Sequence, residues 1–205
     1  MMTHRATNGM DDVLAAYPAP GGSAVTKEIR ALDHHCVAFL ALCPFVVMST
    51  ATPTGQPDVS PRGGEPGFLR VLDAHTVLLP DSNGNNRLDS LRKVAANPQV
   101  ALLCMVPGVD DTLRISGRAQ LMPAEAAPVE LDGRGRPPRS VLRITVEVAF
   151  LHCAKALMRS RLWDPAAQVA RDRLASSAEM LRDHTGAAGP LESQEDMRRR
   201  YEADL

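Results

Sequence analysis

The fold is decided by residues 58–120, which open with Asp58-Val59-Ser60-Pro61-Arg62-Gly63-Gly64 and continue with Pro80-Asp81-Ser82-Asn83-Gly84-Asn85-Asn86-Arg87. A helix-like segment ending at Asn97-Pro98, an apolar strand and Thr112-Leu113-Arg114-Ile115-Ser116-Gly117-Arg118 follow. Polar and glycine-rich residues stand where strands are expected to end, and each group carries an arginine. Loops of this kind can converge on one anionic ligand.

Around this stretch the sequence predicts short strands with few helices between them. Strands are expected over residues 45–50, 57–62, 68–72, 76–79, 100–106, 112–122 and 140–150. Amphipathic helices are predicted over residues 26–42 and 87–96. Closely spaced strands favour an antiparallel barrel over a parallel α/β sheet. The chain divides into a flexible N-terminal arm at 1–25, a barrel domain at 26–164 and a C-terminal helical extension at 165–205. The proline-rich residues 123–139 are interpreted as a solvated loop rather than an anion site.

Composition excludes several classes of protein. The net charge is −1 and aromatic residues make up 3% of the 205 residues, so nucleic acid is not an expected partner. No window approaches the ~18–20 apolar residues of a membrane helix, and the first residues lack a signal peptide. A cytoplasmic protein is expected. The four cysteines form no metal-binding spacing, so no metal site is predicted, and buried reduced thiols are expected instead.

These motifs resemble the pyridoxamine 5′-phosphate oxidase-like family of FMN-binding split barrels, in particular the branch known as predicted flavin-nucleotide-binding proteins. A second signature of that branch runs from Cys153 to Trp163. The resemblance implies a mainly β (α+β) fold, a six-stranded antiparallel split β-barrel with Greek-key order and peripheral helices. It also implies a homodimer with FMN at the interface, and an oxidoreductase that acts on an unknown small molecule. Arg62 is followed by glycines and Arg87 by Leu88, so the family's arginine–lysine pairs are missing and vitamin B6 oxidation is not expected.

Asn86 and Arg87 are the first candidate site residues. Asn86 precedes a predicted helix and Asp89 lies three residues later, which resembles a reciprocal N-cap. A capped helix start offers backbone N–H groups and partial positive charge to a phosphate, and Arg87 adds a guanidinium. The resemblance assigns this turn to the FMN phosphate. The alternative is an ordinary cap with a solvated arginine.

Ser60 and Arg62 are two apart on a predicted strand, so both side chains can reach one ligand. The resemblance gives this strand polar contacts to the flavin, whereas Pro61 and the glycines could simply end an edge strand. Asp81 and Asn83 follow the strand predicted over residues 76–79, and the resemblance places them at the edge of the flavin ring. Asn83-Gly84 is also a hairpin signal, although the helix that follows argues against a hairpin.

Three more cations complete the candidate set. Arg114 shares a strand face with Ser116, and the resemblance places it near the flavin ring; it could equally be solvated. Lys155 and Arg159 are four apart and share a helical face that could stabilise reduced flavin or be solvated. No catalytic residue is identified. The alternatives are a non-catalytic flavin-binding, storage or sensor module, or the same fold binding haem or a deazaflavin, with His34, His35 or His152 as axial ligands.

Overall fold

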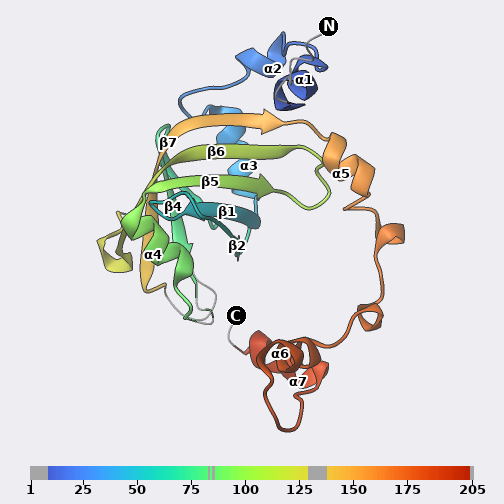
Figure 1. Ribbon diagram of the computed structural model, residues 1–205. Coiled ribbons are helices and arrows are strands. Elements are labelled where there is room, and N and C mark those ends of the chain that lie inside the picture. Colours follow the sequence, from blue (N-terminus) through green and yellow to red (C-terminus); the bar gives the residue numbers. More distant parts are fainter. Residues whose placement is uncertain (1–8, 83, 85, 129–137, 204–205) are drawn as a thin grey trace, which may run out of the picture.

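The computed structural model describes residues 9–82, 84, 86–128 and 138–203, and its centre is one antiparallel sheet (Figure 1). Its strands are β1 (Phe45–Ala51), β2 (Pro57–Gly63), β3 (Arg70–Asp73), β4 (Thr76–Asp81), β5 (Gln99–Met105), β6 (Thr112–Pro123) and β7 (Ser140–His152). The order across the sheet is β2-β1-β5-β6-β7-β4-β3, so β2 and β3 are its edges. The long strands β6 and β7 carry the sheet round in a strong curve (Figure 1).

The expected number of six strands is wrong, because the sheet has seven. The number six came from the family resemblance, whereas each of the seven strands lies where the sequence pattern predicts one. The shortest strand, β3, corresponds to the pattern at residues 68–72 and pairs with β4 through Arg70↔Leu78 and Val71↔Val77. The turn between them is stabilised by the Asp73 side chain, which accepts a hydrogen bond from the backbone N–H of His75 at 2.7 Å. An Asx-type turn of this kind lets a very short edge strand form.

The helix predicted over residues 26–42 is shorter than expected. Two helices occur instead, α2 (Ser23–Thr26) and α3 (His34–Leu42). Between them Ile29 forms a β-bridge with Ala149, exchanging two backbone hydrogen bonds of 2.9 Å. The Asp33 side chain accepts the backbone N–H of Cys36 at 2.8 Å and so defines the start of α3. Pairing with the sheet and this cap together exclude one continuous helix.

The core lies on the concave side of the sheet, under α3 and α4 (Asp89–Ala96). Strand alternation creates it: β1 buries Val46, Met48 and Thr50, and β5 buries Val100, Leu102 and Cys104. Leu40 of α3 and Val94 of α4 close it from the helix side. Three of the four cysteines are buried here as free thiols, as expected.

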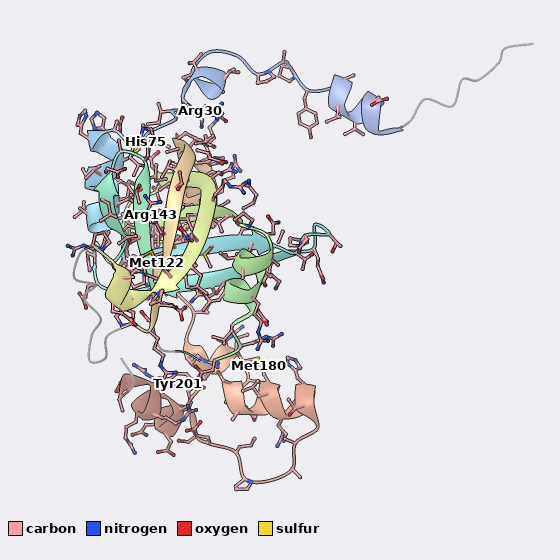
Figure 2. All side chains as sticks on the ribbon, turned by 90° about the vertical axis from the view of Figure 1, so that its left-hand side faces the viewer. Arg30, His75, Met122, Arg143, Met180 and Tyr201 are labelled. Atoms are coloured by element: carbon pink, nitrogen blue, oxygen red, sulfur yellow. The ribbon has the colours of Figure 1, made fainter. Side chains whose placement is uncertain are left out.

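The remaining helices lie outside this core. They are α1 (Gly9–Ala15), α5 (Lys155–Ser160), α6 (Ser177–Thr185), α7 (Gln194–Glu202) and the short 3-10 turns η1 (Ala124–Ala126), η2 (Pro165–Ala167) and η3 (Arg171–Arg173). Both views place α6 and α7 beyond one end of the sheet (Figures 1 and 2), and Figure 2 labels Met180 of α6 and Tyr201 of α7 there. Neither helix buries a side chain in the described residues. Within the described part of the chain, no helix has the length and apolar character needed to span a membrane.

Candidate functional site

A pocket of about 760 Å³ opens between the edge strand β2, the end of β4, the connection from β4 to α4 and the first residue of β7. A volume of several hundred cubic ångströms is typical of cofactor and small-molecule sites. Its described lining is Asp58, Val59, Ser60, Pro61, Arg62, Gly63, Pro80, Asp81, Ser82, Gly84, Asn86, Arg87, Leu88, Asp89, Ser90, Leu91, Arg139 and Ser140.

An ion pair joins two distant strands of the curved sheet beside this pocket. Arg62 Nη1 on β2 donates to Asp81 Oδ1 on β4 at 2.7 Å, and each side chain is only about one fifth exposed (21% and 19%). Four strands separate β2 from β4 in the order of the sheet. The curvature therefore brings a sheet edge and a distant strand together, and side chains join them. The pocket lies at this junction.

Arg62 also presents a buried N–H group for which the described residues supply no acceptor. Its Nε atom is buried and has no hydrogen-bond partner. An arginine carries five N–H donors in a planar fork, and leaving one of them buried and unpaired costs free energy. An anion in the pocket would supply the missing acceptor, and the donor set therefore fits a phosphate or carboxylate group.

Two further ion pairs surround the pocket. Lys93 Nζ of α4 donates to Asp58 Oδ2 of β2 at 2.8 Å, which ties the helix to the strand. Arg87 is paired with Asp89, and this contact raises the pKa of Arg87 and lowers that of Asp89. With Arg62 bound to Asp81, every described aspartate of the lining has a cationic partner. Arg139 stands in addition to these pairs, so the described lining together with Lys93 carries one excess positive charge.

The predicted cap at Asn86 is wrong. Helix α4 begins at Asp89, the preceding residue is Leu88, and no side chain caps the helix. Asn86 and Leu88 both have left-handed backbone conformations, with φ of 54° and 60°. These two residues turn the chain sharply on either side of Arg87, which consequently lies outside the helix. A left-handed leucine is uncommon because its Cβ crowds the backbone, and such strain concentrates at functional loops.

The structure brings five of the predicted site residues to one pocket. Ser60 and Arg62 share a face of β2, as alternation predicts, and Asp81, Asn86 and Arg87 complete the group. Asn83 lies outside the described residues.

The other three predicted residues do not line this pocket within the chain. Arg114 lies on the outer face of the sheet, between the buried Leu113 and Ile115, with its guanidinium 5.0 Å from the ring centroid of Phe150. Lys155 and Arg159 lie exposed on α5, next to the β5–β6 connection that Trp163 contacts. Strand alternation places Arg114 and Arg62 on opposite faces, because Arg62 pairs with the core residue Val46. One chain does not bring all these cations to one ligand.

Sequence reasoning did not select Asp58, Lys93, Arg139 and Ser140. Asp58 could have been found, since it stands two residues before Ser60 and shares its strand face. Arg139 belongs to the segment interpreted as a solvated loop, and it reaches the pocket because Ser140 pairs with Asp81 at the start of β7. No local pattern signals that pairing.

Comparison with known proteins places the chain in a family. A sequence model described as pyridoxamine 5′-phosphate oxidase matches residues 32–153, more than half of the chain. The chain belongs to the pyridoxamine 5′-phosphate oxidase family. No curated protein matches it at a significant level.

Solved structures similar to this family member include HupZ of Group A Streptococcus, with a TM-score of 0.47, 19% identity, and coverage of 58% of this chain and 93% of that chain. A putative pyridoxamine 5′-phosphate oxidase from Lactobacillus delbrueckii has a TM-score of 0.45 and 18% identity, covering 60% and 99%. An F420 reductase has a TM-score of 0.39 and 16% identity, covering 55% and 93%. The family assignment rests on the sequence match.

Proposed function

We propose that this protein binds FMN, with the FMN phosphate in the pocket between β2, β4 and α4, and acts as a flavin-dependent oxidoreductase on a small molecule. The observation that carries the proposal is the buried, unpaired Nε of Arg62 at a pocket with excess positive charge. Membership of the pyridoxamine 5′-phosphate oxidase family supports a flavin as the ligand. The proposed architecture is the split barrel, whose domain covers residues 26–164 between an N-terminal arm and a C-terminal helical extension.

Arg62 and Arg87 have separate tasks in this proposal. Arg62, whose side chain is about four-fifths buried, supplies a fixed N–H donor in the pocket lining, because its Nη1 is bound to Asp81. Arg87 stands on the strained turn between Asn86 and Leu88 and supplies charge from the loop side. Ser60, on the same strand face as Arg62, adds a hydroxyl group. Charge-assisted bonds from these residues would bind and orient a phosphate group.

The cationic residues on the outer face of the sheet and on α5 would act on the flavin bound by a second copy of the chain. We propose a homodimer with FMN at its interface, in which Arg114, Lys155 and Arg159 of one copy approach the flavin held by the other. Their separation from the pocket within one chain favours this arrangement over a site built by one chain. Bound flavin supplies hydride transfer at its ring. The protein's own residues bind and orient it and place positive charge near it.

The first test is the visible absorption spectrum of the protein purified without added cofactor, with mass identification of any released chromophore. Flavin bands and the mass of FMN are expected. A Soret band would identify haem instead, and a deazaflavin mass would identify that cofactor. A colourless protein that also fails to bind added FMN would overturn the proposal.

The phosphate assignment is tested with Arg87→Ala, which we expect to weaken FMN binding about tenfold, as the loss of one charge-assisted contact implies. Arg92→Ala is the matched control, because Arg92 is an exposed arginine of α4 that does not line the pocket. Turnover of reduced flavin with candidate acceptors distinguishes an oxidoreductase from a storage or sensor module. Unchanged FMN affinity in Arg87→Ala would remove Arg87 from the site.

A further inference from the structure

We infer that Asp81 is a positioning residue, which does not bind the anionic ligand but aims Arg62 at it. The inference rests on the proposed function, because it assigns a task within the proposed phosphate site. Its basis is geometric. Asp81 Oδ1 accepts from Nη1 of Arg62 at 2.7 Å, and the Nε–H of the same guanidinium is buried with no acceptor among the described residues.

The guanidinium is rigid and planar, so binding one end of it determines the direction of the rest. An arginine has several rotatable bonds, and an unrestrained side chain loses considerable rotamer freedom when it binds a ligand. Asp81 restrains Arg62 before any ligand arrives, because the side chains of both residues are about four-fifths buried. Holding a donor in place in advance raises affinity by reducing the entropy lost on binding.

Asp81 itself is held by the sheet. It is the last residue of β4 and pairs with Ser140, the first residue of β7. Arg62 stands on the edge strand β2, one residue before the strand ends at Gly63. The ion pair therefore anchors a residue of a free edge to a residue of a paired strand. The direction of Arg62 depends on this contact across the open side of the sheet.

Electrostatics alone predicts the opposite effect of removing Asp81. A carboxylate next to a phosphate site repels the ligand, so its loss should strengthen phosphate binding. Loss of positioning should weaken it. The direction of the change in FMN affinity in Asp81→Asn therefore decides between the two roles.

The experiment measures the dissociation constants of FMN and of riboflavin, which lacks the phosphate, for wild-type protein, Asp81→Asn and Asp58→Asn. For Asp81→Asn we expect FMN binding to weaken about tenfold while riboflavin binding changes less than about twofold. A general loss of structure would weaken both ligands. Asp58→Asn is the matched control for charge, because Asp58 lines the same pocket but pairs with Lys93 rather than Arg62. A loss of FMN affinity as large as that of Asp81→Asn would refute a positioning role specific to Asp81.

The outcomes separate this inference from the proposed function. Wild-type protein that binds neither flavin refutes the proposed function. Wild-type protein that binds FMN, with Asp81→Asn binding it equally well or more tightly, refutes the positioning role and leaves the FMN site standing. Asp81→Glu retains the charge and lengthens the side chain by one methylene; we expect it to recover thermal stability but only part of the FMN affinity. No recovery of affinity at all would contradict the positioning role, because a carboxylate that can again pair with Arg62 should restore part of its direction.

Discussion

Arg62 and Asp81 form a 2.7 Å ion pair although four strands separate their own strands in the sheet. The pair joins β2 to β4 through side chains, because the two strands are not neighbours in the sheet. A pocket occupies the space beside it, with α4 on one side and the start of β7 on the other. The same contact thus bears on the stability of the fold and on the proposed ligand site.

Because the ion pair joins two distant strands, the effects of substituting Arg62 and Asp81 on the free energy of unfolding should be strongly coupled. Arg62→Ala and Asp81→Ala should each lower the free energy of unfolding by about 1–2 kcal/mol, because each leaves a largely buried charge unpaired. The double variant should lose less than the sum of the two, with a coupling of about 1 kcal/mol. Urea unfolding of the four proteins measures this. Additive losses would mean that the pair does not stabilise the fold.

Gly117 is expected to tolerate no side chain. It stands where the register between β6 and β7 shifts, and a Cβ there would lie 2.0 Å from the backbone oxygen of Thr145. Gly117→Ala should cost about 3 kcal/mol or more, because neither strand can move without breaking the ladder. Gly21→Ala is the control, since a Cβ there meets nothing within 4 Å. Equal stability of both variants in urea unfolding would contradict the close approach of Gly117 to the backbone of Thr145.

The cap of α3 predicts a pH dependence of stability. The backbone N–H of Cys36 donates to Asp33 and lowers the pKa of that carboxyl below its ordinary 3.8. A lowered folded pKa means that the carboxylate stabilises the fold fully above pH 3.8 and loses this effect as the pH falls through the lowered value. Asp33→Asn retains a capping oxygen that does not titrate.

The measurement is the melting temperature of both proteins between neutral pH and about pH 2. Any excess of the wild-type melting temperature over that of Asp33→Asn at neutral pH should shrink as the pH falls. A difference that stays constant with pH would show that the Asp33 charge contributes nothing.

Trp163 is expected to fasten α5 to the sheet. Its indole Nε1 donates to the backbone oxygen of Val109 at 2.9 Å, in the β5–β6 connection. Trp163→Phe keeps an aromatic ring but removes the donor, at a cost of about 1 kcal/mol. Hydrogen exchange should become faster in residues 155–160 and remain unchanged in β5. Leu162→Ala, at a half-exposed neighbour, is the control and should leave exchange in α5 nearly unchanged.

The sequence predicted what depends on near neighbours in the chain. Alternation along β1 and β2 follows from the geometry of an extended chain, so the shared face of Ser60 and Arg62 could be predicted without a structure. Family membership was also visible, because the motifs of residues 58–120 are contiguous. The start of α4 was not predicted, because Leu88 adopts a left-handed conformation that its own side chain disfavours.

Tertiary structure alone decided which residues meet. The pairing of Arg62 with Asp81 depends on the summed curvature of the intervening strands, and the approach of Arg139 depends on the register between β4 and β7. The separation of Arg114 from Arg62 depends on which strand face each occupies once the sheet has formed. A sequence pattern specifies the two faces of each strand, whereas the packing of the whole sheet determines which face meets which ligand.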